Sequence, residues 1–344
     1  MEKKRGFYSG KIWIFLLAIM VFAAFYKLPY YVSAPGSAEV ISDFVTVEDG
    51  QDSDGDFMFT TIRMARANIY SYLWAKVADY HKIYKLEEVR SEDETDEEYS
   101  VRQLKLMDES QNTAVLNAYR KAGQKADIMT NGIYILHVGE DTPADGTLKT
   151  GDRILNVDGK AIVSQQFFVD YVSGKKAGNK VSLKVEREGE TMEKTITLAR
   201  LKETGNIGVG ITLVEDRSVK TDPEVEFNTD TIGGPSAGLM FSLEIYNQLT
   251  EADYTAGKKI AGTGTISEDG TVGPIGGIDQ KIVAADEEGA EVFFAPNEEG
   301  EEGSDYEIAV ETAREIETDM VIVPVDTFDD AVSYLEKINR QQGA

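Results

Sequence analysis

The sequence contains no cysteine and only two histidines, His81 and His137, among its 344 residues. The absence of cysteine excludes disulfides, thiolate nucleophiles and zinc sites built on cysteine. The two histidines lie far apart in the sequence and lack neighbouring acidic residues in a metal-ligand pattern, so we interpret them as structural or surface residues. Any base that activates a hydroxyl nucleophile in this chain is therefore expected to be a lysine.

Basic side chains are also scarce relative to acidic ones, 35 against 61, which gives a formal net charge of -26. Binding a phosphate backbone requires a basic surface, so we expect no nucleic-acid partner. The acidic surface favours solubility but identifies no substrate. Hydrophobic residues make up 42% of the chain, which is enough for the cores of two or three domains.

A long apolar run occurs at the N-terminus, where Ile12 to Tyr26 carries no charged residue and several basic residues precede it. We expect residues 12–32 to form a transmembrane anchor and residues 1–11 to be cytoplasmic, because basic flanks stay inside. The run is short of the roughly 20 residues of a full span, but Lys27 can reach the interface, where Tyr30 and Tyr31 also fit. This predicts a single-pass protein of the cell membrane with its catalytic part outside. The alternative is a signal peptide cleaved after Ala34, which Pro35 disfavours.

Residues 33–125 are expected to form an extracytoplasmic N-terminal region. Its first part, 36–60, is rich in β-forming residues, and the apolar spacing predicts helices over 63–90 and 100–124. We interpret the Tyr- and Trp-bearing face of the first of these helices as core.

Alternating aspartates at Asp52, Asp54 and Asp56 resemble the start of a calcium-binding loop. An EF-hand loop also needs a glycine after the third aspartate and a glutamate at its twelfth position, where this chain has Phe57 and Arg63. We therefore expect a solvated hairpin loop and no metal site.

Residues 126–202 read as a compact β-rich unit. The run from Pro143 to Gly159 contains Pro-Ala-x-Gly-x-Leu-x-x-Gly-Asp-x-Ile-Leu-x-Val-Asp-Gly, and it resembles the signature of a PDZ domain. The resemblance implies capture of a peptide by strand addition beside a helix near 163–173. The implied groove residues are Asn131, Gly132, Ile133 and Tyr134. The loop before them departs from the glycine-and-aromatic form of many PDZ domains, and a packing or gating role without ligand is the alternative.

A serine between glycines, in Gly-Gly-Pro-Ser-Ala-Gly at residues 233–238, directly precedes a stretch with helical spacing. The first turn of a helix has unpaired N–H groups and a partial positive charge, which can stabilise an alkoxide or an oxyanion. Ser236 is therefore a candidate nucleophile. The alternative is that Ser236 is an ordinary N-cap.

A second motif, Pro-Ile-Gly-Gly-Ile-Asp-Gln-Lys, ends at Lys281. Together the two motifs make residues 205–342 resemble the Lon-type proteolytic domain. The resemblance implies that Ser236 is the nucleophile, Lys281 the general base and Thr263 a support for the lysine; Thr265 stands where many Lon enzymes have glutamate. A lysine is a base only when neutral, and its pKa is normally near 10.4, so we expect burial by neighbouring isoleucines at 275, 278 and 282 to lower it.

The expected fold is α+β and multidomain: an N-terminal transmembrane helix, a PDZ-like β-rich domain and a Lon-type proteolytic α/β domain. This order resembles the SepM-like membrane-anchored proteases of Gram-positive bacteria, whose streptococcal members trim secreted peptide pheromones. No phosphate-binding loop is present in the sequence, so we expect no ATP and no other cofactor. The resemblance implies an extracytoplasmic serine endopeptidase acting on secreted peptides. It also implies a possible homo-oligomer, because Lon-type domains often form rings. The alternatives are a non-catalytic PDZ adaptor and a cytoplasmic quality-control protease.

Overall fold

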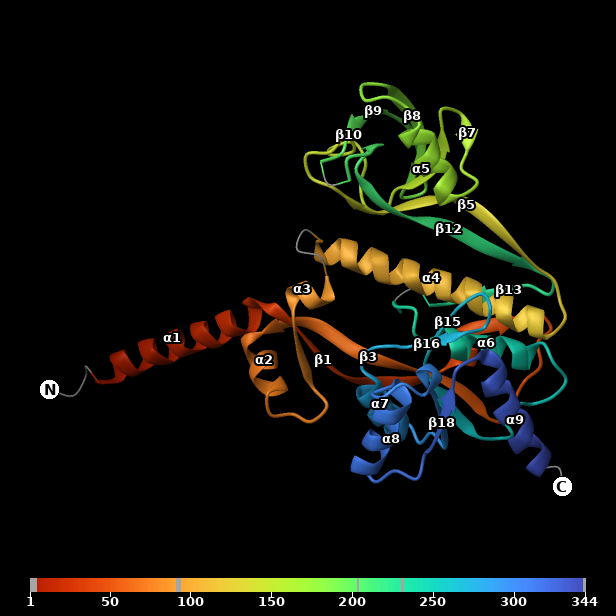
Figure 1. Ribbon diagram of the computed structural model, residues 1–344. Coiled ribbons are helices and arrows are strands. Elements are labelled where there is room, and N and C mark those ends of the chain that lie inside the picture. The colour runs from red at the N-terminus through yellow and green to blue at the C-terminus, as the bar shows by residue number, and fades with distance from the viewer. Residues whose placement is uncertain (1–4, 91–93, 203, 230–231, 343–344) are drawn as a thin grey trace.

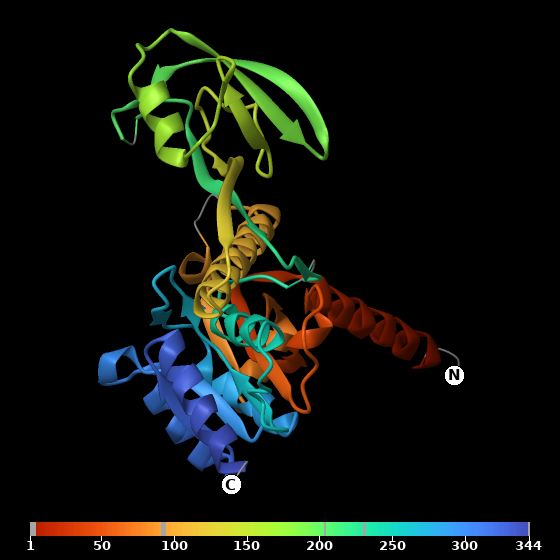
Figure 2. The same cartoon turned by 90° about the vertical axis from the view of Figure 1, so that its right-hand side faces the viewer.

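The computed structural model describes residues 5–90, 94–202, 204–229 and 232–342, with side chains from Trp13 onward (Figure 1). Helix α1 (Arg5–Phe25) projects away from the body of the molecule. A β-rich domain stands apart from the body, and helix α4 (Asp96–Lys121) lies between the two, as both views show (Figures 1 and 2).

The body is built on a six-stranded mixed sheet in the order β18-β17-β14-β3-β1-β4. The strands are β1 (Lys27–Val40), β3 (Asp56–Asn68), β4 (Lys82–Lys85), β14 (Lys259–Gly262), β17 (Val292–Pro296) and β18 (Val321–Val325). Strands β3, β14, β17 and β18 run parallel, and β1 is antiparallel to both β3 and β4. The sheet therefore joins strands from the first and last parts of the chain.

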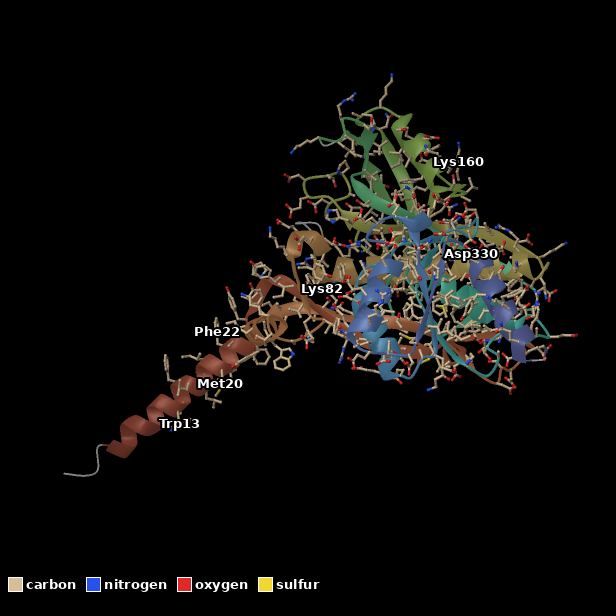
Figure 3. All side chains as sticks on the ribbon, turned by 60° about the horizontal axis from the view of Figure 1, so that its bottom comes forward. Trp13, Met20, Phe22, Lys82, Lys160 and Asp330 are labelled. Carbon is tan, nitrogen blue, oxygen red and sulfur yellow. The ribbon has the colours of Figure 1, made fainter. Side chains whose placement is uncertain are left out.

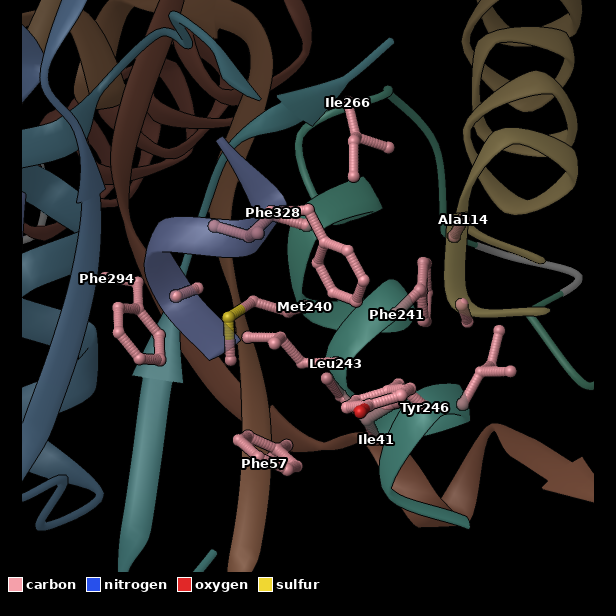
Figure 4. Packing of buried hydrophobic residues seen from close by; sticks show 14 of the residues in the cluster. Ile41, Phe57, Ala114, Met240, Phe241, Leu243, Tyr246, Ile266, Phe294 and Phe328 are labelled. Atoms are coloured by element: carbon pink, nitrogen blue, oxygen red, sulfur yellow. The ribbon is translucent and has the colours of Figure 1, made fainter. Parts of the chain in front are cut away.

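Helices cover both faces of this sheet, because alternate residues of its strands point to opposite sides. Met58 and Phe293 pack under α7 (Ile278–Glu287) and α8 (Asp305–Glu315). Phe57 and Phe294 pack on the other face, against α6 (Gly238–Gln248) and α9 (Phe328–Gln342). Figure 4 shows this second core around α6. Every residue of α6 is buried, since α4 covers its outer side.

Short elements complete the body. They are η1 (Ile41–Asp43), β2 (Val45–Val47), α2 (Ile69–Ala75), α3 (Leu86–Val89), β13 (Val225–Phe227), β15 (Thr265–Ile266), β16 (Val272–Gly273) and η2 (Glu298–Gly300). Strand β2 pairs with β13, and β15 forms a hairpin with β16.

The β-rich domain contains a sheet in the order β12-β5-β6-β8-β9, with β7 paired to β6. Its elements are β5 (Ala126–Val138), β6 (Arg153–Val157), β7 (Lys160–Ala161), α5 (Gln165–Ser173), β8 (Lys180–Arg187), β9 (Glu190–Thr197), β10 (Ala199–Arg200), β11 (Ile207–Gly208) and β12 (Ile211–Thr221). The domain has its own apolar core, separate from that of the body. Strand β12 belongs to this sheet, so the domain extends beyond the expected boundary near residue 202.

The helix predicted over 63–90 is wrong. Residues up to Asn68 continue β3, which is hydrogen-bonded to β1 and β14. The Asn68 side chain then accepts a hydrogen bond from the Ser71 N–H at 2.8 Å and starts the short helix α2. Pairing with strands distant in sequence overrides the local helical spacing. The region 33–125 is accordingly not a separate unit, because β1 and β3 are strands of the body's sheet.

The N-terminal segment expected to cross a membrane, 12–32, is only partly helical. Helix α1 ends at Phe25, and β1 begins at Lys27. Pro29 cannot donate a helical hydrogen bond, and Tyr31 is buried between β3 and β4. In the described part of the chain, no helix combines the length and the apolar character needed to cross a membrane.

Candidate active site

Ser236 lies in the loop that leads into α6. The helix begins at Gly238, and its N-cap is Ala237. The alternative role of Ser236 as an N-cap is therefore wrong. Gly238 has to be glycine, because a Cβ there would lie 2.7 Å from Ser110 Oγ and 2.8 Å from Ile266 Cγ2. The small residues of the motif thus let the nucleophile loop pack closely against its neighbours.

Lys281 reaches the serine from α7. This helix starts at Gly277, which has φ of +73° and so suits glycine. The lysine side chain is only 2% exposed. Its Nζ lies 2.8 Å from Ser236 Oγ and 2.9 Å from Thr263 Oγ1. The structure brings together the three residues that the motifs single out.

The hydrogen bonds around Nζ fit a neutral amine. Thr263 Oγ1 donates its own hydrogen to the Ser236 carbonyl, at 3.0 Å, and can only accept from Lys281. The Thr60 carbonyl, 3.1 Å from Nζ, can also only accept. These two acceptors take the two N–H bonds of a neutral amine. The lone pair is then left for the hydroxyl hydrogen of Ser236.

Burial favours the neutral form of the Lys281 amine. It lowers the pKa of the Lys281 ammonium to about 7, and the nearby Asp305 opposes this by favouring the charged form. Ile278 and Ile282 are buried beside the lysine on α7, and Ile275 is partly buried. Burial also raises the pKa of Asp305 to about 6, although its carboxylate accepts a hydrogen bond from the Ile275 N–H at 2.8 Å.

Two backbone N–H groups at the start of α6 are candidates for stabilising an oxyanion. The N–H of Leu239 donates to the Gly264 carbonyl. The N–H groups of Ser236 and Ala237, in contrast, have no hydrogen-bond partner among the residues that the structure describes. They lie at the positive end of the helix dipole, where negative charge is stabilised.

A cleft of about 930 Å³ opens over the serine. It is formed by β3, by α4, by the loop before α6 and by the segment before α7. Its apolar lining consists of Phe59, Ile62, Met64, Leu104, Met107, Ile232, Pro235, Ala237, Pro274 and Ile275. Thr265 also lines it. A cleft of this size accommodates several residues of a peptide.

Helix α4 positions the nucleophile loop, a role that the sequence motifs do not show. The Gln103 carbonyl accepts a hydrogen bond from the Gly234 N–H at 2.9 Å. The buried Ser110 hydroxyl donates to the Pro235 carbonyl, also at 2.9 Å. The available signal in the sequence is a helix whose buried side carries polar residues. They are Ser110, Gln111, Thr113 and Asn117.

The same helix contacts the β-rich domain. Glu98 Oε1 accepts a hydrogen bond from Thr150 Oγ1 at 2.9 Å and lies 3.2 Å from His137 Nδ1. Lys105 Nζ lies 3.8 Å from the centre of the Tyr134 ring. One helix therefore touches both the nucleophile loop and the β-rich domain.

The predicted peptide groove along 131–134 is wrong, because β5 is not a sheet edge. Ile133 is buried and pairs with β12 on one side and with β6 on the other, and Tyr134 pairs with the same two strands. Asn131 donates to Ser218 Oγ on β12, and Gly132 faces Asp216. The outer strands of this sheet are β12 and β9, and β12 lies beside α5.

Comparisons with known proteins agree with this arrangement. Residues 223–336 match the family model described as the Lon protease (S16) C-terminal proteolytic domain, and residues 97–198 match the model described as a PDZ domain. The Lon protease of Campylobacter concisus is 36% identical over 99 residues, which cover 29% of this chain and 11% of that protein. A probable periplasmic serine endoprotease DegP-like of Ectopseudomonas mendocina is 39% identical over 75 residues, which cover 22% of this chain and 16% of that protein.

A solved structure, the PDZ domain of an SdrC-like protein from Listeria monocytogenes, is 35% identical and covers 26% of this chain and 93% of that chain, with a TM-score of 0.25. The chain thus spans a small part of its curated relatives' length. Ser236 Oγ and the buried amine of Lys281 lie within hydrogen-bond distance, an arrangement that suits a serine hydrolase with lysine as the base. More specifically, the chain carries a serine protease domain of the Lon type together with a PDZ domain.

Proposed function

We propose that this protein is an ATP-independent serine endopeptidase that cuts exported peptides on the outer side of the membrane. The observation that carries the proposal is the 2.8 Å approach of a buried lysine amine to Ser236 Oγ. A lysine with a pKa near 7 is substantially neutral at physiological pH and can accept a proton.

In the proposed reaction, Lys281 takes the hydroxyl proton while Ser236 Oγ attacks the scissile carbonyl carbon. The carbonyl oxygen becomes an oxyanion beside the N–H groups of Ser236 and Ala237. The resulting ammonium donates to the Thr60 carbonyl and to Thr263 Oγ1. It then protonates the leaving amine, and an acyl-enzyme remains. A water molecule, deprotonated by the same lysine, releases the second product.

The cleft and the PDZ domain together favour short or unfolded peptides. The substrate backbone has to reach a serine in a cleft formed by β3, α4 and the segment before α7, which an extended chain enters more readily than a folded one. Strand β12 offers an outer sheet edge beside α5, where an extended peptide can add as a strand. Within this proposal, secreted signalling peptides such as pheromones are the substrate class, and the N-terminal helix attaches the enzyme to the membrane.

The test uses the full chain and a library of quenched fluorescent peptides. Ser236→Ala and Lys281→Ala are each expected to lose at least about a thousandfold in kcat/KM, because removing one member disables the pair. Ser333→Ala, at an exposed serine of α9, and Lys259→Ala are matched controls outside the site and should keep wild-type activity. Full activity of Ser236→Ala would refute the mechanism. A wild-type chain that folds, binds peptides and cuts none would favour the adaptor.

Comparing the peptides secreted by cells that carry wild-type protein or Ser236→Ala identifies the natural substrate. Peptides that change in length only when Ser236 is present support the exported-peptide proposal. If the purified enzyme is active but the two secreted sets are identical, the substrate class is wrong and the mechanism stands.

A further inference from the structure

Helix α2 and the turn after it expose an apolar face. Tyr70, Leu73, Trp74 and Val77 are between 46% and 76% exposed. Their spacing of three and four residues puts them on one side of the helix, while Ala75 is buried on the other. The expectation that this Tyr- and Trp-bearing face is core is therefore wrong. A contiguous apolar face of this kind marks an interaction surface. We call these four residues the α2 face.

The α2 face is continuous with the surface of α1. Tyr70 Oη donates to the Met20 carbonyl at 3.1 Å, and the Asn68 side chain donates to the Ala24 carbonyl at 3.0 Å. From Trp13 to Phe25 every side chain is exposed except that of Ala23. Figure 3 shows Trp13, Met20 and Phe22 on this projecting helix, away from the rest of the body. A helix that is apolar on all sides fits a lipid environment.

The positions of the tryptophans also indicate that lipid covers this surface. The chain has only two tryptophans, and both belong to this combined surface, one on α1 and one on the α2 face. Tryptophan and tyrosine concentrate where a bilayer meets water, because their rings are apolar and their polar atoms remain hydrated. A protein partner would also accept aromatic residues, but it would not require α1 to be apolar all round.

The segment that contains the α2 face is more basic than the chain as a whole. Residues 60–90 contain six basic and three acidic side chains, whereas the whole chain has a net charge of -26. Arg66, Lys82, Lys85 and Arg90 pair with carboxylates, whereas Lys76, next to the α2 face, forms no ion pair in the described residues. Lys76 instead lies over the Tyr72 ring, 4.8 Å from its centre. Local positive charge beside an apolar face is complementary to anionic lipid headgroups.

We propose that the α2 face lies in the headgroup layer of an anionic bilayer and forms a second membrane contact beside α1. This inference rests on the membrane attachment in the proposed function. It has a geometric consequence, because β3 runs directly from Asn68 to Thr60, whose carbonyl contacts Lys281. Eight residues of strand at about 3.3 Å each span roughly 25 Å, which is the greatest distance at which this part of β3 can hold Thr60 from the α2 end of the strand.

The experiment uses the two tryptophans as depth probes in the full chain. Trp13→Phe leaves Trp74 as the only tryptophan, and Trp74→Phe leaves Trp13. Each variant is reconstituted in phosphatidylcholine–phosphatidylglycerol vesicles whose acyl chains are brominated near the headgroup or near the bilayer centre. We expect Trp74 fluorescence to be quenched by the shallow bromines more than by the deep ones. Trp13 should be quenched most by bromines at a greater depth.

An unquenched Trp74 together with a quenched Trp13 would overturn the proposal, since the α2 face would then contact water or protein. Cross-linking between chains through Val77→Cys would then identify a second copy as the occupant. If neither tryptophan is quenched, the membrane attachment fails as well. Cleavage of soluble peptides by the same variants is measured in parallel, so a failed attachment is distinguished from a failed peptidase.

A charge placed in the α2 face supplies an independent readout. Leu73→Glu should reduce the quenching of Trp74 by shallow bromines at least about twofold and leave cleavage of soluble peptides unchanged. Val321→Glu introduces the same charge at an exposed valine of β18, at the opposite edge of the body's sheet, and should change neither quantity. Equal quenching in Leu73→Glu and in its parent would contradict lipid contact at this face.

Discussion

With Lys281 as the proposed base, we expect its pKa to set the pH dependence of cleavage. Burial lowers this pKa from 10.5 to about 7. The difference corresponds to about 5 kcal/mol in favour of the neutral amine. The reactive fraction of free enzyme is then about one tenth at pH 6, one half at pH 7 and nine tenths at pH 8. We expect kcat/KM to rise about fivefold from pH 6 to pH 7 and less than twofold from pH 7 to pH 8.

Asp305 provides the perturbation that tests this assignment. Its negative charge favours the ammonium and so raises the pKa of Lys281. Asp305→Asn removes that charge, while the amide oxygen can still accept the hydrogen bond from the Ile275 N–H. The acidic limb of kcat/KM should therefore move to lower pH. A move of one pH unit would raise the neutral fraction at pH 6.5 from about one quarter to about three quarters, a threefold gain in activity.

The assay measures kcat/KM for one quenched peptide from about pH 5.5 to about pH 9. Asp279→Asn is the matched control, because it removes another carboxylate of this region that pairs with Lys82 on the protein surface. Lys281→Arg should be inactive throughout, since a guanidinium is not deprotonated. An acidic limb that stays in place or moves to higher pH in Asp305→Asn would refute the reasoning. A wild-type profile that still rises steeply above pH 9 would refute the lowered pKa itself.

Four further outcomes follow from the structure. Thr263→Val removes a partner of Lys281 and should lower kcat about 10- to 100-fold, with about 1–2 kcal/mol lost in denaturant unfolding; unchanged kcat would contradict its supporting role. Ser110→Ala should cost about 1 kcal/mol and slow acylation in burst kinetics, because the bond to Pro235 is lost. Gly238→Ala should abolish cleavage and destabilise the fold by several kcal/mol, since its Cβ would overlap its neighbours; wild-type melting would contradict this. Burial raises the pKa of Glu244 to about 7, so the contribution of this carboxyl to the free energy of unfolding is present below pH 4.5 and is lost as the pH rises through 7. Glu244→Gln should therefore raise the free energy of unfolding by about 1–3 kcal/mol at pH 8 and by almost nothing at pH 4.

The contact between Ser236 and Lys281 could be predicted because each residue lies in a contiguous motif. Ser236 is surrounded by glycines that a close approach requires, and Lys281 follows a glycine that starts its helix. The third contact of the lysine could not be predicted in this way. It is the backbone carbonyl of Thr60, 221 residues away, and a carbonyl carries no side-chain signature.

Two wrong expectations, the helix over 63–90 and the groove along 131–134, have one physical cause, which is pairing between strands that are separated in the sequence. The apolar spacing of 63–90 suits a helix, but hydrogen bonds to β1 keep the first part extended. The groove along 131–134 was misplaced because a strand's edges depend on its neighbours, and β12 covers one edge of β5. The PDZ signature itself falls within 143–159, where turns and strands are close in sequence, and it was predicted correctly.

The central sheet combines strands from two separate parts of the chain, and this affects the order in which the site can assemble during synthesis. Strands β1 and β3 are made before α4 and the PDZ domain, and β14, β17 and β18 are made after them. The Thr60 carbonyl therefore meets Lys281 only when the ends of the chain join in one sheet. A chain still emerging from the ribosome contains Thr60 before Lys281, which donates to the Thr60 carbonyl, has been made. The contacts of Lys281 therefore form only after the segment from β14 to β18 has been made.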